Sequence, residues 1–370
     1  MRLRAIRTGL TAAITLCCLL GAQTAQAQKY RLVNLGPGIP TGIANDGTIS
    51  GHVRTEANWA DYYAAVWKTG DTGPTLLGKF PGDVYSTTSA ISGAGTVLGY
   101  SYRYEAAGHY QIARGAPFTW TAATGLQALP WQAQHTTTGA HAINNLGHIS
   151  SSSSAKDPTD DRYKPFLWRP NTGITYLDGI AGTSPHYIKS LNDQDQGTGT
   201  ASDTNDPQMT KGFFWSPSTG VKSISSPSST YSDIVPTTIN SQGQVAGFLR
   251  DPKTGRTKLF TWSARYGTTN LMLLNSYAEE LVAVSIDKNY RVIGNRDYFY
   301  RPDGNNPPVG FVWSLLTGLK DIHSLIVDNG PASAPVVTLN RLVAVNESGQ
   351  IVASARINDQ PHVVRLDPVR

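Results

Sequence analysis

Cysteine is almost missing from the sequence. The only two cysteines among 370 residues, Cys17 and Cys18, lie in an N-terminal segment with the features of a signal peptide. In that segment a basic start precedes the apolar run Leu10–Leu20, which is too short to span a bilayer, and a small-residue cleavage site ends at Ala27. Residues 1–27 are therefore predicted to be a signal peptide cleaved after Ala27, which indicates a secreted or periplasmic protein. The mature chain would have no disulfide and no thiol chemistry.

The sequence also has little excess charge and no second long apolar run. Its formal net charge of +5 includes three arginines of the signal peptide, and without them 28 basic residues remain against 26 acidic residues. The remaining lysines and arginines form no cluster, so nucleic acid is not expected as a partner. Residues 28–370 contain no apolar run of membrane length, so no membrane span is expected.

Motifs that carry known chemistry are missing as well. The eight histidines are scattered without an HExxH pair, and there is no Gly-x-Ser-x-Gly elbow and no glycine-rich phosphate loop. Residues 193–197 begin like a calcium loop, but no glutamate follows at the required distance, and Asn, Asp and Gly are favoured in ordinary turns. We therefore expect no metal and no cofactor, and the catalytic residues of any enzyme activity stay unknown.

What the sequence does have is a short pattern in seven copies. Each copy reads as a small residue, an aliphatic residue, usually Asn, two free positions, usually Gly, one free position and a second aliphatic residue, as expected for a β-hairpin. In the fourth copy the glycine is shifted by two positions to Gly197, and the sixth copy has Tyr290 in its place. The first aliphatic residues, spaced 47 to 59 residues apart, are here called the anchors: Ile43, Ile91, Ile143, Leu191, Ile239, Ile286 and Val345.

A second pattern, centred on a tryptophan and usually reading Phe-x-Trp, follows each of the first six hairpins. Each unit therefore holds four short strands, and four antiparallel strands at this period are typical of a β-propeller blade. The predicted fold is all-β, a seven-bladed β-propeller of four-stranded antiparallel blades. It forms a single domain of residues 28–370. The small residue before each anchor suits an innermost strand near the axis, where space is least. The repeats begin near residues 41, 88, 140, 188, 236, 283 and 342.

The two ends of the chain complement each other. The seventh unit stops after a third strand near residues 362–366, with Arg365 where tryptophan is expected. Residues 30–36 read like a fourth strand and precede the first hairpin without a unit of their own. We predict that this N-terminal strand completes the last blade and closes the ring, which removes exposed sheet edges.

The units resemble the extracellular HAF repeats of bacterial secreted proteins, which are named for His-Ala-Phe before the tryptophan. The resemblance covers nearly the whole mature chain through its Asn-x-x-Gly-x-Val-x-Gly and Phe-x-Trp parts, and it implies a secreted repeat protein. The family's histidine is not matched, so no role for it carries over. Its position holds Tyr63, Ala116, Lys164, Lys211, Lys258, Val309 and Pro361.

The unrepeated loops are the predicted location of function. Loops between second and third strands and loops between blades share one face of a propeller, and binding residues usually lie on such loops. Here these loops are rich in Tyr, Arg and Asp, a composition that suits a recognition surface. The candidate ligand-binding residues are Tyr62, Arg103, Tyr104, His141, Arg162, Tyr187, Tyr231, Arg296, Tyr298 and Arg341.

Two functions follow from this surface. The first is a binding module, a monomer, with an extracellular glycan or a surface protein as ligand at the axial mouth of the long-loop face. The alternative is a polysaccharide lyase or hydrolase that uses loop carboxylates and tyrosines at the same mouth. Two carboxylates about 5–10 Å apart would favour the enzyme, because glycosidases use such separations. The candidate carboxylates are Asp161, Asp233, Asp297, Glu279 and Glu280. A purely structural surface protein is the third possibility.

Overall fold

The structure is a computed structural model of the chain. It describes residues 26–54, 62–71, 73–107, 110–130, 136–154, 163–177, 182–184, 188–206, 209–270, 281–296, 310–327 and 336–369. The predicted signal peptide therefore lies almost wholly outside the described residues. Among the described residues, no helix is long and apolar enough to cross a membrane.

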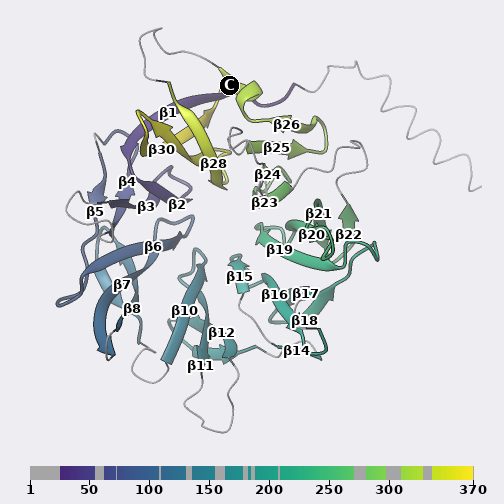
Figure 1. Cartoon of the computed structure of the whole chain (residues 1–370), viewed down its shortest axis with the longest axis horizontal. Helices are drawn as coiled ribbons and strands as arrows, with labels where there is room; N and C mark the ends of the chain where they lie inside the picture. The colour runs from purple at the N-terminus through teal and green to yellow at the C-terminus, as the bar shows by residue number, and fades with distance from the viewer. Residues whose placement is uncertain are drawn as a thin grey trace, which may run out of the picture.

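Seven antiparallel sheets stand around a common axis as the blades of a β-propeller (Figure 1). Blade 1 contains β2 (Ile39–Ile43), β3 (Ile49–Arg54), β4 (Tyr62–Trp67) and β5 (Thr75–Leu76). Blade 2 contains β6 (Tyr85–Ile91), β7 (Val97–Ala107), β8 (Tyr110–Thr121) and β9 (Gly125–Ala128). Blade 3 contains β10 (Thr136–Ile143), β11 (Ile149–Ser154), β12 (Tyr163–Arg169) and β13 (Gly173–Tyr176).

Blade 4 contains β15 (Ile188–Leu191), β16 (Gly197–Asp203), β17 (Thr210–Ser216) and β18 (Gly220–Ile224), and β14 (Thr183–Ser184) pairs with the far end of β16. Blade 5 contains β19 (Asp233–Ile239), β20 (Val245–Arg250), β21 (Thr257–Ser263) and β22 (Gly267–Asn270). Blade 6 contains β23 (Leu281–Ile286), β24 (Val292–Arg296), β25 (Gly310–Ser314) and β26 (Gly318–Asp321), followed by the short helix η2 (His323–Leu325).

Blade 7 is assembled from both ends of the chain, as predicted. β28 (Thr338–Val345), β29 (Ile351–Ile357) and β30 (Gln360–Pro368) are followed in the sheet by β1 (Tyr30–Pro37). β1 runs antiparallel to β30, with Tyr30 opposite Pro368. β27 (Ile326–Val327) then pairs with β1 in parallel. Figure 1 shows the purple first strand against the yellow last strand. The ring is thus closed by backbone pairing between residues more than 300 positions apart.

The Phe-x-Trp pattern supplies the core between blades. Its phenylalanines on β8, β12, β21 and β25 are at most 1% exposed. Opposite Phe118 lies Gly99 of β7, where a Cβ atom would come within 2.6 Å of the ring. The same holds for Gly247 beneath Phe260, where the separation would be 2.8 Å. The aromatic ring therefore packs directly on a bare backbone, which explains why glycine recurs at the end of the hairpin pattern.

The turn after each anchor requires left-handed backbone at the fourth following position. Glycine fills this position in five blades, with φ between 74° and 88°. Asp195 (φ 58°) and Tyr290 (φ 62°) fill it in blades 4 and 6. The expected shift to Gly197 in the fourth copy is therefore wrong, because Gly197 is the first residue of β16 and Asp195 makes the turn.

The asparagines that follow the anchors bind both within and between blades. In blade 5, Asn240 Oδ1 accepts hydrogen bonds from the backbone N–H groups of Gln242 (3.0 Å) and Gln244 (2.9 Å). Its Nδ2 donates to the carbonyl of Asp287 in blade 6 at 3.0 Å. Equivalent Nδ2 bonds leave Asn144, Asn192 and Asn346 for the next blade at 2.9–3.0 Å. One amide thus caps its own turn and latches the neighbouring blade.

Asn240→Ala is expected to lower the free energy of unfolding by about 2 kcal/mol, because four side-chain hydrogen bonds are lost, one buried and three partly buried, at about 0.5–1 kcal/mol each and partly offset by relaxation. Ala44 holds the same position in blade 1, so the fold accepts the substitution. Ser241→Ala, at the exposed neighbouring position, is the control and should change stability by less than about 0.5 kcal/mol. Equal effects of the two variants in urea unfolding would contradict the latch.

Candidate functional site

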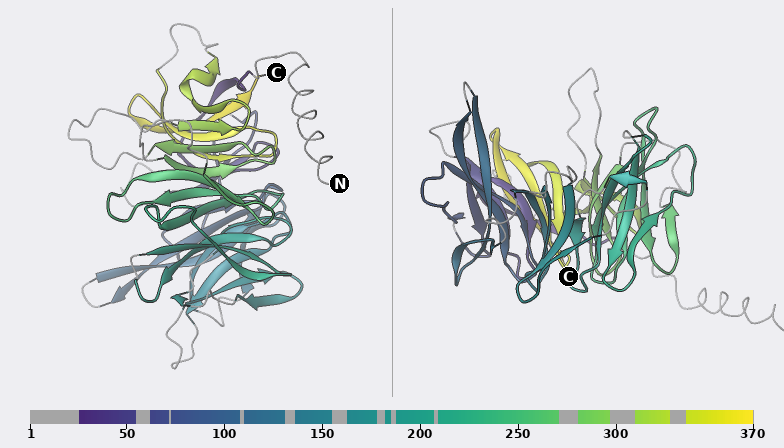
Figure 2. Two further views of the ribbon diagram at one scale, coloured as in Figure 1. Left: turned by 90° about the vertical axis from the view of Figure 1, so that its right-hand side faces the viewer. Right: turned by 90° about the horizontal axis from the view of Figure 1, so that it is seen from below.

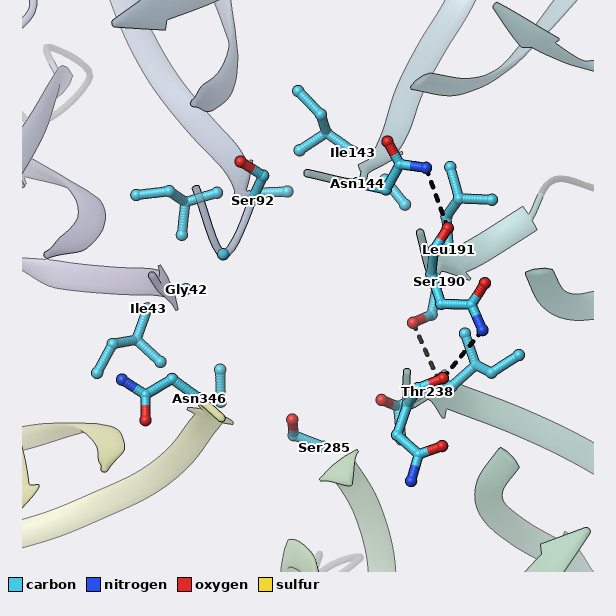
Figure 3. A pocket seen from close by; sticks show the side chains of 18 of the residues that line it. Gly42, Ile43, Ser92, Ile143, Asn144, Ser190, Leu191, Thr238, Ser285 and Asn346 are labelled. Atoms are coloured by element: carbon cyan, nitrogen blue, oxygen red, sulfur yellow. Dashed lines mark hydrogen bonds between the residues drawn. The ribbon is translucent and has the colours of Figure 1, made fainter. Parts of the chain in front are cut away.

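A hollow about 340 Å³ in volume, here called the axial cavity, lies where the inner strands of the seven blades meet. Figure 3 shows residues from several inner strands converging on it. Each blade contributes its anchor and the two residues before it to the wall of the cavity. Several residues of the turns that follow the anchors line one end of the cavity. The three-residue segments are 41–43, 89–91, 141–143, 189–191, 237–239, 284–286 and 343–345.

A β-bulge in every innermost strand brings one extra residue to this cavity. The register with the second strand shifts at the same place in all seven blades, two residues before the anchor. A bulge leaves one residue unpaired and re-aims its side chain. The seven bulge residues are Thr41, Ser89, His141, Lys189, Thr237, Val284 and Val343. Five of them are small or aliphatic, whereas adjacent blades 3 and 4 carry His141 and Lys189.

His141 was expected on a loop, and the structure corrects this placement. It lies within β10 and lines the axial cavity. Its Nε2 lies 3.2 Å from the Ser152 hydroxyl. Burial lowers the pKa of the imidazole to about 4, because removal from water disfavours the charged form. His141 is therefore a neutral donor or acceptor at pH 7.

Lys189 is the only lysine or arginine among the residues that line the cavity. Burial lowers the pKa of its ammonium group. Among the described residues, no carboxylate lies within 4.0 Å of its Nζ atom and no hydrogen bond reaches it. The side chain is only partly exposed. It thus places an unpaired amine in a cavity lined mainly by hydroxyl, amide and aliphatic groups, with His141 beside it in the ring and Asp193 and Glu347 at the turn end.

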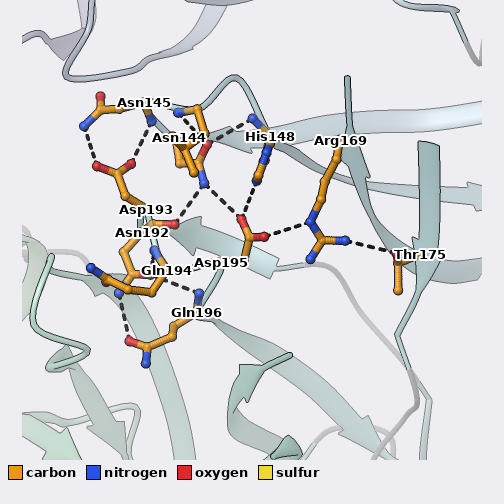
Figure 4. A network of polar contacts seen from close by, with 11 residues as sticks. Asn144, Asn145, His148, Arg169, Thr175, Asn192, Asp193, Gln194, Asp195 and Gln196 are labelled. Carbon is orange, nitrogen blue, oxygen red and sulfur yellow. Dashed lines mark hydrogen bonds and ion pairs between the residues drawn. The ribbon is translucent and has the colours of Figure 1, made fainter. Parts of the chain in front are cut away.

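The carboxylates near the cavity already have donors (Figure 4). Asp193 accepts two hydrogen bonds of 2.8 Å from the backbone and side chain of Asn145. Asp195 accepts from Asn144 Nδ2 (3.1 Å) and Arg169 Nε (2.8 Å), and its Oδ1 lies 2.6 Å from His148 Nδ1. The segment that begins like a calcium loop is thus a junction between blades 3 and 4.

The face opposite the asparagine turns, here called the loop face, carries a tyrosine cluster on blade 2. The rings of Tyr85 and Tyr102 stack with centroids 4.5 Å apart and planes 15° apart. The Tyr104 ring lies 6.0 Å from that of Tyr85 and is 38% exposed as a residue. Tyr85 begins β6, and Tyr102 and Tyr104 lie on β7, whose hairpin with β8 projects beyond the neighbouring blades in Figure 2.

The base of the tyrosine cluster is fixed to blade 3, and the other face of β7 is fixed by a buried carboxylate. Tyr100 donates a hydrogen bond of 3.0 Å to the Ala140 carbonyl. Burial raises the pKa of Tyr100 to about 12. Arg103, which is half exposed, binds the buried Asp83 with Nε–Oδ1 at 3.0 Å. Arg103 and Tyr104 are consecutive residues of β7, so their side chains lie on opposite faces of the sheet, and of the two only Tyr104 joins the cluster with Tyr85 and Tyr102.

The other described candidates are distributed over different blades. Tyr62 begins β4 and its ring meets His52 edge-on at 5.1 Å. Tyr231 precedes β19 and lies beneath Lys258 Nζ at 4.1 Å. Arg296 ends β24, and Arg341, expected on a loop between blades, is an exposed residue of β28. Arg162, Tyr187 and Tyr298 lie outside the described residues.

Of the five carboxylates proposed for catalysis, only Asp233 lies among the described residues. Asp233, the first residue of β19, is 0% exposed and its Oδ2 binds Arg250 Nη2 at 2.7 Å. Its Oδ1 accepts from the Thr210 N–H at 3.1 Å. Asp233 therefore joins β19, β20 and β17 and is not presented to a substrate. Asp161, Asp297, Glu279 and Glu280 lie outside the described residues.

Of the seven bulge residues, sequence reasoning selected only His141, and it missed Lys189 and the other five. A signal was available, because aligning the seven copies on their anchors places two basic residues among small and aliphatic ones two positions upstream. The bulge that turns this position toward the axis depends on pairing with the second strand, which the repeat alone does not reveal.

No protein-family model matches the sequence, and no curated protein shows detectable similarity to it. Solved structures share the fold. The propeller domain of the Trilobed protease from Pyrococcus furiosus aligns with a TM-score of 0.56 and 7% identity over 92% of this chain and 98% of that domain. Oligogalacturonate lyase from Vibrio parahaemolyticus aligns with a TM-score of 0.56 and 8% identity over 92% of both chains.

A third solved structure, TolB from Acinetobacter baumannii, aligns with a TM-score of 0.44 and 14% identity over 88% of this chain. The chain spans 64% of the length of that TolB. At these identities the likeness concerns the fold alone. The Pyrococcus domain is described as having an open velcro topology, whereas here β1 pairs with β30 inside blade 7.

Proposed function

We propose that this protein is an exported monomeric binding module of the HAF-repeat type whose ligand is an extracellular glycan. The tyrosine cluster of Tyr85, Tyr102 and Tyr104 supports this proposal. Tyrosine offers a broad apolar face at low cost in conformational entropy, and its hydroxyl still forms hydrogen bonds. The exposed edge of the cluster, Tyr104, is continuous with rings that are already stacked and therefore held in place.

The rigidity of the hairpin favours recognition by stacking. The backbone pairs of β7 and β8 run from Val97 opposite Trp120 to Ala107 opposite Tyr110. At Gly115 of β8 a Cβ atom would lie 2.7 Å from the Tyr102 ring, so this ring packs closely against the backbone. A sugar ring placed on Tyr104 would meet a surface that loses little freedom on binding.

Binding should be tested on a glycan array with the mature protein and Tyr104→Ala. We expect about two- to tenfold weaker binding of the variant, since one aromatic contact contributes about 0.5–1.5 kcal/mol. Tyr266→Ala is the matched control, because Tyr266 is 73% exposed on the turn between β21 and β22 of blade 5. Thermal unfolding should show that both variants fold.

The array also decides between ligand classes. Failure of the wild type to bind any glycan would overturn the glycan proposal. Equal binding by the wild type and Tyr104→Ala would overturn the assignment of the site. The surface-protein alternative gains support only if a purified protein partner binds and Tyr104→Ala weakens that binding.

A further inference from the structure

The axial cavity is lined by three charged residues, and only one of them, Lys189, has no partner among the described residues. Its lining contains Lys189 and the neutral His141 at the bulge positions, with Asp193 and Glu347 at the turn end. Asp193 is held by Asn145, and the Glu347 carboxylate lies 3.9 Å from Lys288 Nζ. Lys189 is four positions before Asp193 in the chain, on the far side of the anchor. Both carboxylates therefore have their own partners, and Lys189 has none among the described residues.

The fold does not need a lysine at this position. Thr41 and Thr237 occupy the same bulge position in blades 1 and 5, and Val284 and Val343 occupy it in blades 6 and 7. Burying an ammonium group without a partner opposes folding, because the charge loses its hydration. A residue that the scaffold does not require and that opposes folding is best explained by a ligand that pairs with it.

We propose that the axial cavity is a second ligand site, distinct from the tyrosine cluster, that binds a small anionic molecule through the Lys189 ammonium group. The anionic group is a carboxylate or a phosphate. Polar groups stand on both sides of Lys189 around the ring. The Ser190 hydroxyl in blade 4 accepts from the Ile239 N–H at 3.1 Å and keeps its own proton to donate to a ligand. The Thr237 hydroxyl in blade 5 donates to the Ala246 carbonyl at 3.2 Å, so it meets a ligand as an acceptor.

The dimensions and chemistry of the cavity limit the ligand. A volume of about 340 Å³ is at the small end of ligand pockets, so the ligand is a small molecule or one terminal unit of a chain. The ring of Thr and Ser hydroxyls suits a polyhydroxylated body. An ammonium group forms charge-assisted hydrogen bonds with oxyanions, which are stronger than neutral ones. A sugar acid and a sugar phosphate share these properties.

Isothermal titration calorimetry with D-glucuronate, inorganic phosphate and neutral D-glucose tests the site. We expect the wild type to bind at least one of the two anions and to bind D-glucose at least tenfold more weakly. Lys189→Thr should weaken anion binding at least tenfold. Threonine is the matched substitution because two other blades carry it at this position. Lys189→Met, which keeps the length of the side chain without its charge, should behave in the same way.

Two controls separate this site from other effects. Lys222→Thr removes an exposed lysine from β18 and should leave anion affinity unchanged. Tyr104→Ala should also leave it unchanged, so that failure of the loop-face proposal and failure of this one are distinguishable. Binding of phosphate alone or of D-glucuronate alone identifies the anion. The proposal is overturned if neither anion binds the wild type, or if Lys189→Thr and Lys189→Met bind as the wild type does.

Discussion

Replacing Tyr30 with alanine is expected to lower the free energy of unfolding by about 3–5 kcal/mol, the range for deleting a buried aromatic side chain. Tyr30 is the first residue of β1 and is 1% exposed. It belongs to a core cluster with Leu325 from blade 6 and Leu339 and Leu366 from blade 7. Its ring thus anchors the closing strand at the junction where the ring of blades is completed.

Tyr266→Ala is the matched control for this prediction. The same side chain is removed at a position that is 73% exposed, so we expect a change below about 1 kcal/mol. Urea unfolding of both variants gives the comparison, with the slope of the transition showing whether the folded state stays equally compact. Equal losses in the two variants would show that closure by β1 contributes little to stability.

The architecture could be predicted from the sequence because the same steric requirements recur in each of the seven blades and leave a repeated residue pattern. Gly99 and Gly247 are needed where an aromatic ring packs on the backbone, and the small residue before each anchor is needed near the axis. The N-terminal strand could be placed because the last unit lacked a partner for its third strand. β14 and β27 could not be predicted, because each has two residues and is defined only by its distant partner.

The candidate site was harder to predict for a physical reason. Arg103 and Tyr104 were selected because aromatic and charged residues stand out in a loop-like segment, and their role in binding stays a prediction. Asp233 is also a charged residue in a loop-like segment, yet it is buried and paired with Arg250. The sequence alone does not show which partner a charged residue has. His141 and Lys189 lie inside a repeated strand, where a bulge set by the neighbouring strand directs them to the axis.

The pH dependence of stability is expected to report the environment of His141. Burial holds its pKa at about 4 in the folded protein, against about 6.5 in an unfolded chain. Above pH 6.5 both states carry a neutral ring, and the contribution of this histidine to stability is fully present. Between pH 6.5 and 4 the unfolded state binds the extra proton, so stability falls as the pH is lowered. With allowance for partial exposure, the loss is about 2–3 kcal/mol.

His141→Thr isolates this contribution, because threonine fills the same bulge position at Thr41 and Thr237 and does not titrate. Between pH 7 and pH 4 the wild type should lose about 2–3 kcal/mol more of its free energy of unfolding than His141→Thr does. Other titrating groups, among them His52 with its pKa lowered by burial, cancel in this difference. A pH-independent difference for His141→Thr would show that the imidazole is hydrated, and the axial cavity would then be a water-filled channel open to solvent at His141.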